Sequence, residues 1–290
     1  MFIGIDHGTT AMRFAGESGE FRISREEAKE FRIADLTRLC PVEEIEGIAL
    51  CYSMGDNITA ITNIRKVRDR GIVSRDGAGK HIGGGTRVYD EVAASGIPSV
   101  VMPGLHRNSP TDPRFKAYSH QTSPEKIGIA YEVCSLLGDD FVVSDVSSNT
   151  VSLLVSEGRL VGAFDACIFA PGILHGALDV DAIRKVDAGK WSANEAFQNA
   201  GVNFSLPEGE RMRTIAMFAA MECTALRLLN SRAKVALAGS LAPVIADEVR
   251  GLLGCDVAVY DEWCASRGLV RIARDIFSGK QGILGLDVDL

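Results

Sequence analysis

The first residues of the chain combine types that could bind phosphate groups. An apolar segment, residues 2–5, runs directly into Asp6, Gly8, Thr9 and Thr10. A hairpin of this composition places backbone N–H groups and small hydroxyls in one concavity, and the acid beside them can hold a magnesium-bound water. The same residues also suit an ordinary hairpin in which Asp and Gly only form the turn. A phosphate site therefore requires a second half elsewhere in the chain.

The middle of the chain repeats this pattern. An apolar segment ends in Asp145, a polar turn carries Ser147, Ser148 and Asn149, and residues 151–155 leave that turn as a strand. We interpret the repeat as a degenerate internal duplication, in which two domains each present a polar hairpin to a shared cleft. Chance similarity is the alternative, because short strand–turn–strand units are common.

A third polar feature lies near the end of the chain. The strand expected over residues 234–241 ends in Gly239 and Ser240, where a missing Cβ lets a flat ligand approach the backbone closely. Gly268 lies inside the last expected helix. Glycine lowers helix stability there, and it is tolerated where two helices or a hinge meet closely.

The spacing of apolar residues predicts an α/β protein. Each half begins with three antiparallel strands, and we place the two domains at residues 1–137 and 138–290. A proline-marked loop is expected over residues 103–124, and the helix after it is expected to be amphipathic and to end at Gly138. The expected helices cover residues 26–40, 86–95, 125–137, 179–187, 192–200, 210–229, 247–253 and 262–278.

The composition argues against several classes of protein. The chain has 290 residues, enough for two domains, and its formal net charge of −7 offers no general attraction to nucleic acid. No run approaches the roughly 18 apolar residues of a membrane span, and the first residues do not have the pattern of a signal peptide. The seven cysteines form no Cys-x-x-Cys pair, which favours reduced thiols. We expect a cytoplasmic protein that binds neither nucleic acid nor a membrane.

Taken in order, these motifs resemble the acetate and sugar kinase/heat-shock-protein/actin superfamily, and within it the butyrate and acetate kinases. The similarity also includes a Gly-Gly pair ahead of a helix and the segment 114–121, which has a basic residue, a Phe and a His. Over nearly its full length the chain is similar to the archaeal methanogenesis marker protein 12 family, which is grouped with these kinases. The resemblance implies two duplicated ribonuclease-H-like (actin-like ATPase) domains with a nucleotide cleft between them.

The resemblance further implies a site for ATP and Mg²⁺. The two hairpins would bind phosphate, the late strand end would border the adenosine, and the N-terminal half would hold the acceptor. The implied catalytic residues are Asp6, Asp145 and His120, and the implied metal ligands are Asp6 and Asp145. The implied binding residues are Gly8, Thr9, Thr10, Ser147, Ser148, Asn149, Gly239 and Ser240 for the nucleotide, and Gly83, Gly84 and Lys116 for the substrate.

Two positions depart from the kinase pattern. Acetate and butyrate kinases usually carry a histidine and glycines in the second hairpin, where this chain has Asp145 and three residues with side chains. A Cβ restricts the backbone and holds it away from a phosphate. Lys116 stands where acetate kinases have an acid, and a cation can hold an anion but cannot replace an acid. We therefore do not expect acetate kinase activity itself. Asp145 could bind a metal, act as a base or repel a phosphate.

Two classes of function stay open. The first is an ATP-binding phosphotransferase of the carboxylate-kinase type, acting on a small-molecule acceptor in methanogen metabolism. The second is a nucleotide-binding ATPase, switch or assembly factor that acts through a protein partner. By analogy with the kinases we expect a homodimer. Residues 164–181 either cap the acceptor site or only connect two elements.

Overall fold

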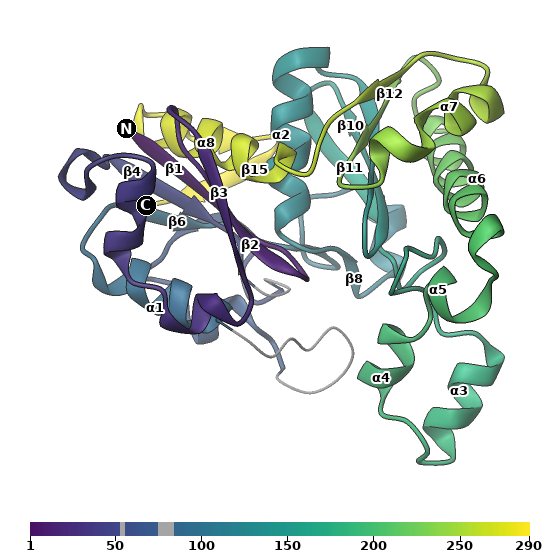
Figure 1. Ribbon diagram of the computed structural model, residues 1–290. Coiled ribbons are helices and arrows are strands. Elements are labelled where there is room, and N and C mark those ends of the chain that lie inside the picture. The colour runs from purple at the N-terminus through teal and green to yellow at the C-terminus, as the bar shows by residue number, and fades with distance from the viewer. Residues whose placement is uncertain (53–55, 75–83) are drawn as a thin grey trace.

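The computed structural model of the protein describes residues 1–52, 56–74 and 84–290. It contains two large β-sheets with helices between and outside them (Figure 1). A small third sheet pairs β7 (Leu105–His106) with β8 (His120–Thr122), inside the segment that the sequence predicted to be a loop. In the described part of the chain, no helix has both the length and the apolar composition needed to cross a membrane.

The first sheet contains the opening hairpin. Its strand order is β14-β15-β5-β6-β4-β1-β2-β3. β1 pairs antiparallel with β2 and parallel with β4, which in turn is parallel to β6. The strands are β1 (Phe2–His7), β2 (Ala11–Ala15), β3 (Glu20–Ser24), β4 (Gly47–Leu50), β5 (Ile61–Asn63), β6 (Ser99–Val101), β14 (Gly282–Ile283) and β15 (Leu286–Asp289).

The second sheet repeats the same topology. Its order is β11-β10-β9-β12-β13, with β9 antiparallel to β10 and parallel to β12, and with β12 parallel to β13. This matches β3-β2-β1-β4-β6 of the first sheet in order and direction, as the predicted duplication requires. The strands are β9 (Phe141–Val146), β10 (Thr150–Ser156), β11 (Arg159–Phe164), β12 (Lys234–Ala238) and β13 (Val257–Val259).

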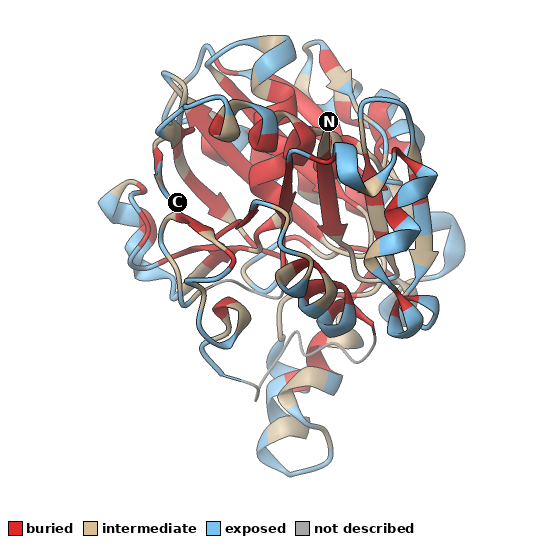
Figure 2. Cartoon of the chain, turned by 90° about the vertical axis from the view of Figure 1, so that its left-hand side faces the viewer, coloured by how far each residue is buried: buried red, intermediate tan, exposed pale blue. Residues whose placement is uncertain are grey.

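Two helices lie between the sheets. α8 (Cys264–Phe277) packs on β1 and β4, and α2 (Glu125–Leu137) packs on β9 and on α8. The helices cross in backbone contact, because a Cβ on Gly268 would lie only 1.8 Å from the carbonyl oxygen of Gly128. Figure 2 shows the sheets and the helices beside them as largely buried, with the exposed residues at the periphery. Glycine at the crossing lets the two halves of the protein meet this closely.

The sequence predicted the bounds of α2 and its end at Gly138, which has a φ of 92° that suits glycine. The expected amphipathic character of α2 is wrong. Every residue from Lys126 to Val133 is buried, because one side of the helix faces the second sheet and another faces α8.

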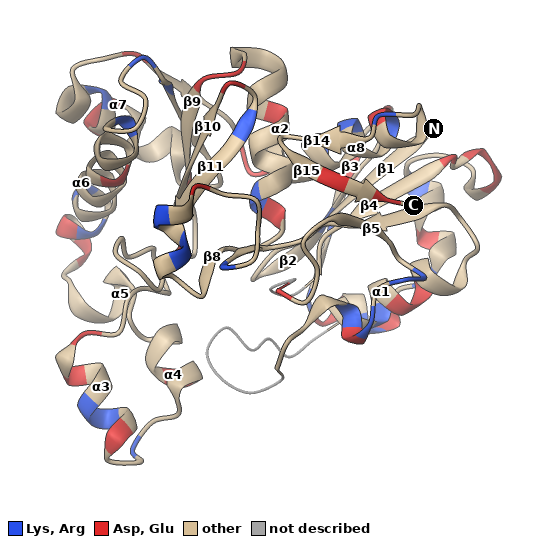
Figure 3. Cartoon of the chain, turned by 180° about the vertical axis from the view of Figure 1, so that it is seen from behind, with Lys and Arg blue, Asp and Glu red and all other residues tan. Residues whose placement is uncertain are grey.

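Further helices cover the outer faces of both sheets. α1 (Gly85–Ala94) packs outside the first sheet, and α6 (Glu208–Arg227) and α7 (Ala242–Leu253) pack outside the second. α3 (Val180–Asp187) and α4 (Ala193–Gln198) extend from the body beyond α5 (Val202–Ser205), as Figure 1 shows. Charged residues lie mainly on the outer helices and turns, whereas the strands carry few (Figure 3).

The α-helix expected over residues 26–40 is replaced by short 3₁₀ segments, η1 (Glu27–Glu30) and η2 (Ile33–Arg38), followed by η3 (Val42–Glu44). The chain is extended at Arg32, whose ψ is 151°. There the Asp35 carboxylate accepts a hydrogen bond from the Arg32 N–H at 2.8 Å. A side chain that bonds nearby backbone in this way competes with helix continuation.

The last residues of the chain return to the first sheet. β15 pairs parallel with β5, and β14 pairs with β15, although residues 138–290 were expected to belong to the second domain. Local apolar patterning does not specify which sheet a strand joins, so this return had no signal in the sequence.

Candidate functional site

Both predicted hairpins and the late strand end meet in one cavity between the two sheets. The cavity has a volume of about 190 Å³. It lies where β1, β9 and β12 end, because strands with matching topology deliver these ends to the same cleft. Ten residues singled out in the sequence line it together: Asp6, Gly8, Thr9, Thr10, Asp145, Ser147, Ser148, Asn149, Gly239 and Ser240.

The other predicted site residues do not line this cavity. Lys116 is exposed in the 3₁₀ segment η5 (Pro113–Ala117). Gly84 is buried ahead of α1, and Gly83 lies outside the described residues. His120 lies on β8 and is not part of the cavity lining. The acceptor roles expected for these residues stay predictions.

His120 is held between two carboxylates. Its Nδ1 lies 2.9 Å from Asp56 and its Nε2 lies 2.7 Å from Asp165. Burial alone would lower the pKa of His120, but its interactions with Asp165 and Asp56 raise that pKa to about 10. The ring is therefore an imidazolium at neutral pH, with both nitrogens donating hydrogen bonds. To act as a base or to bind an anion, it would first have to leave one of these carboxylates.

The sequence interpretation missed most of the charge in the cavity. Five further charged residues line it: Arg13, Glu125, Lys126, Asp261 and Glu262. With the two hairpin acids they give the lining five carboxylates and two cations. Arg13 carried a weak signal, because it alternates with apolar residues on the strand that leaves the first hairpin. The local sequence around the other four residues does not distinguish them from ordinary exposed charges near the start of a helix.

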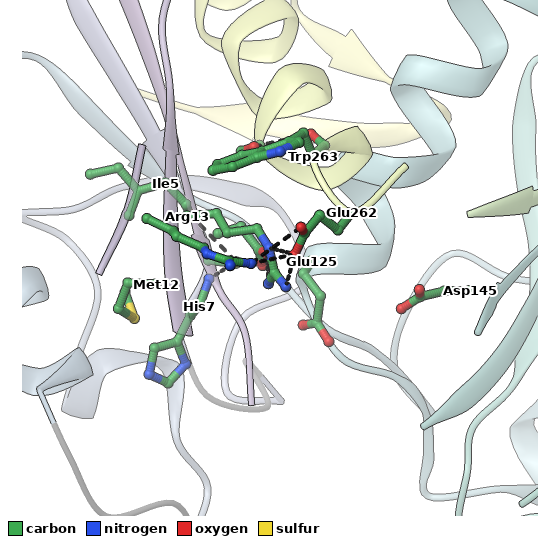
Figure 4. Close-up of polar contacts among 12 residues, drawn as sticks. Ile5, His7, Met12, Arg13, Glu125, Asp145, Glu262 and Trp263 are labelled. Atoms are coloured by element: carbon green, nitrogen blue, oxygen red, sulfur yellow. Dashed lines mark hydrogen bonds and ion pairs between the residues drawn. The ribbon is translucent and has the colours of Figure 1, made fainter. Parts of the chain in front are cut away.

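Arg13 links the first hairpin to the segment ahead of α8. Its Nη2 lies 2.9 Å from Glu262 Oε2, and its Nη1 lies 3.5 Å from Asp6 Oδ2. Figure 4 shows Arg13 against Glu262, with Glu125 beside them and Asp145 across the gap. Position 8 favours glycine, since a Cβ there would lie 2.8 Å from the backbone carbonyl oxygen of Ala11.

Lys126 neutralises the acid of the second hairpin. Its Nζ lies 2.7 Å from Asp145 Oδ2 and 2.8 Å from Glu125 Oε1, and the residue is 3% exposed. Burial by itself would lower the pKa of Lys126, but the two carboxylates raise it above its ordinary value. A metal ion that bound Oδ2 of Asp145 would compete with this ammonium group. The metal and catalytic roles predicted for Asp145 stay predictions.

Residues 172–175 brace the second hairpin. The N–H groups of Ile173 and Leu174 donate to the carbonyl oxygens of Ser147 and Ser148 at 3.2 and 3.0 Å. Ile173 and Leu174 also line the cavity, and a Cβ on Gly172 would lie 2.4 Å from the Ser148 oxygen. The segment expected either to cap a site or only to connect elements thus forms part of the cavity wall.

The cavity suits magnesium that arrives with phosphate groups. Within residues 1–52, 56–74 and 84–290, no group of three or more His, Cys, Asp or Glu residues could hold a metal ion. Magnesium in nucleotide sites is usually held by one or two carboxylates together with substrate phosphates. The hairpin hydroxyls provide donors for phosphate oxygens. Because complete small-molecule pockets measure roughly 300–1,000 Å³, a cavity of this size could enclose only part of a nucleotide, such as its phosphate groups.

Burial raises the pKa of Asp6 from 3.8 to about 6, against the opposing effect of Arg13. The unfolded chain therefore loses its proton first, and this carboxyl reduces stability as the pH rises from about 4 to 6. We expect Asp6→Asn to raise the free energy of unfolding above pH 6, by up to about 3 kcal/mol, and to leave it unchanged near pH 4. Urea unfolding at both pH values tests this, and a variant less stable than wild type at both would contradict it.

Sequence comparisons identify the family. A UPF0285 protein of Methanosarcina mazei is 45% identical, and the match covers 99% of each chain. The chain belongs to the UPF0285 family. Another member, from Methanothermobacter thermautotrophicus, is 40% identical over 100% of this chain and 99% of its own. No protein-family model matches the sequence.

Solved structures show the fold class of this UPF0285 protein. A propionate kinase from Francisella tularensis superposes with a TM-score of 0.60 over 92% of this chain and 98% of its own, at 10% identity. A ROK family glucokinase from Streptomyces griseus, in complex with glucose and AMPPNP, gives a TM-score of 0.52 over 94% and 99%, at 13% identity. At such identities the likeness concerns the fold alone. The predicted two-domain actin-like α/β fold is confirmed.

Proposed function

We propose that this UPF0285 protein binds Mg–ATP between its two sheets and transfers the terminal phosphoryl group to a small acceptor, as carboxylate kinases do. The observation that carries the proposal is the meeting of Asp6–Thr10, Asp145–Asn149 and Gly239–Ser240 in one cavity. The methanogen relatives and the resemblance to methanogenesis marker protein 12 support a role in methanogen metabolism.

The proposed roles follow from the side chains at each wall. Thr9 and Thr10 donate to phosphate oxygens from the first hairpin, and Ser147 and Ser148 do so from the second. Gly239 has a φ of 96°, and with its neighbour it borders the nucleoside. A magnesium ion bound with the nucleotide supplies charge neutralisation at the phosphates. Catalysis then consists mainly of positioning and of excluding water from the transferring group.

The charge balance of the cavity should make nucleotide binding strongly dependent on magnesium. Five carboxylates and two cations line it, so a bare nucleotide triphosphate meets a net negative field. Arg13 and Lys126 do not offset this, because both are already paired with carboxylates. Asp6 is the carboxylate that we propose holds magnesium-bound water, since it belongs to the first hairpin and its contact with Arg13, at 3.5 Å, is longer than the 2.7 Å contact between Lys126 and Asp145.

A titration with Mg–AMPPNP, followed by calorimetry and thermal unfolding, tests the nucleotide part. We expect binding to raise the melting temperature of the wild type. Asp6→Asn should weaken the affinity for Mg–AMPPNP about tenfold or more, the equivalent of one charge-assisted interaction. Asp256→Asn is the matched control, because this exposed acid lies outside the cavity. The proposal would be refuted if Mg–AMPPNP gave neither a heat of binding nor a higher melting temperature with the wild type.

A nucleotide-dependent switch that acts on a protein partner is the second candidate. The crossing of α2 and α8 favours it, because both helices line the cavity at their N-terminal ends and join the two halves. Acceptor screening by ADP release separates the candidates: a kinase needs the acceptor, whereas a switch hydrolyses ATP slowly without one. By analogy with the kinases, we propose a homodimer in either case. Sedimentation equilibrium would measure the oligomeric state.

A further inference from the structure

Arg25 is a partly buried cation without a carboxylate partner among the described residues. Its Nε is buried and has no hydrogen-bond partner, and its Nη1 contacts the Met12 sulfur at 3.3 Å. Burial lowers the pKa of Arg25, and Tyr52 only partly opposes this. A cation that is partly withdrawn from water without a counter-charge costs stability. The position therefore suits a ligand that brings negative charge.

The guanidinium of Arg25 lies at the N-terminus of α1. The Gly84 N–H donates to the Arg25 carbonyl oxygen at 2.8 Å. A Cβ on Gly85 would lie 3.0 Å from Arg25 Nη1 and 1.9 Å from His7 Nε2, so glycine lets both side chains reach the backbone of the first helical turn. The first N–H groups of a helix have no partner within it, and the helix dipole attracts anions there.

His7 connects this position to the phosphate hairpin. It follows Asp6 on β1, and successive side chains of a strand point to opposite faces. Figure 4 shows the His7 ring directed away from Arg13 and Asp145. The ring stacks on Tyr52 with centroids 5.1 Å apart, and the Tyr52 hydroxyl lies 2.7 Å from Thr86 Oγ1. Arg25, His7, Tyr52 and Thr86, here called the Arg25 cluster, thus adjoin the first hairpin but lie outside the cavity.

We propose that the Arg25 cluster binds a carboxylate or phosphate group of the second substrate. The assignment of this anion to the acceptor rests on the proposed phosphotransferase function. The binding of an oxyanion by the cluster does not depend on that function. A guanidinium matches the two oxygens of such a group with parallel donors, and the Thr86 hydroxyl and the first turn of α1 add further donors. A neutral acceptor would leave Arg25 uncompensated, so the cluster selects anionic acceptors.

Calorimetric titration with inorganic phosphate and, separately, with succinate tests the proposal, each with and without saturating Mg–AMPPNP. We expect the wild type to bind at least one of these anions, and the arm that binds identifies the phosphate or the carboxylate. Arg25→Gln should weaken that binding about tenfold to a hundredfold, the loss of a charged hydrogen-bonding group. Mg–AMPPNP binding should stay unchanged in this variant. Arg65→Gln, an equal charge change at an exposed residue, should bind like the wild type.

Unfolding without added anion provides a second readout. Removing an uncompensated cation should leave the melting temperature of Arg25→Gln equal to or above that of the wild type, whereas a merely structural arginine would lower it. Equal anion binding by Arg25→Gln and wild type, or no binding by wild type, overturns the site. Competition between the anion and Mg–AMPPNP overturns its assignment to the acceptor. Anion binding without nucleotide binding supports the site and refutes the proposed function.

Discussion

Gly268→Ala is expected to lower the free energy of unfolding by about 3 kcal/mol or more, at the upper end of overpacking effects. The new Cβ would lie 1.8 Å from the oxygen and 2.6 Å from the carbon of Gly128, and 3.1 Å from the Glu132 nitrogen. All three are backbone atoms of α2, so no side-chain rotation relieves the clash. The helices cannot simply separate, because α8 packs on β1 and α2 packs on β9.

Gly251→Ala is the matched control for this prediction. Gly251 also lies inside a helix, α7, but a Cβ there would meet no atom within 4 Å. This change should raise the free energy of unfolding by about 0.5–1 kcal/mol, the difference in helix propensity. Urea unfolding of both variants at one pH gives the comparison. Similar stabilities for the two variants would show that the helix crossing tolerates extra volume.

A change in the spacing of the two helices would also affect the candidate site. α2 carries Lys126 and α8 carries Cys264 into the cavity lining, and both residues lie near the N-terminal ends of their helices, on the same side of the crossing. A wider crossing would therefore displace the Lys126–Asp145 ion pair. We expect any folded Gly268→Ala protein to bind Mg–AMPPNP more weakly than the Gly251→Ala control, which the same calorimetry measures.

Lys126→Met is expected to lower the free energy of unfolding by about 3–5 kcal/mol near pH 7, a loss similar in size to that of Gly268→Ala. The substitution keeps the apolar volume but leaves Asp145 and Glu125 as buried carboxylates without their cation. In the wild type the raised pKa of Lys126 means that its contribution is fully present below its unfolded pKa and fades only in strongly alkaline solution. The deficit of the variant should therefore be largest at neutral pH and shrink as the pH falls and the carboxylates protonate.

Two companion variants separate this effect from a general loss of charge. Lys29→Met removes an exposed lysine whose partner, Glu26, is also exposed, and such pairs contribute no more than about 1 kcal/mol. Adding Asp145→Asn to Lys126→Met removes one uncompensated charge and should recover part of the loss. Guanidinium unfolding at pH 5 and pH 7 tests all three. Equal losses for Lys126→Met and Lys29→Met would contradict a buried role for Lys126.

The sequence by itself determined the features that depend on local order. Asp6–Thr10 and Asp145–Asn149 are short strand–turn–strand patterns, and their repetition predicted the matching sheets before any packing was known. The apolar spacing and Gly138 likewise placed the bounds of α2. These signals succeed because strand alternation, turn composition and helix ends are set by residues close in the chain.

Only the tertiary structure decided what depends on distant partners. Glu125 and Lys126 look like the polar start of an ordinary helix, and they become part of the cavity because α2 is enclosed by a sheet and by α8. The pairing of His120 with Asp56 and Asp165 and the return of β15 to β5 have the same origin. So does the buried Nε of Arg25, which has no hydrogen-bond partner among the described residues. Burial and electrostatic pairing arise between segments far apart in sequence, so local patterns do not encode them.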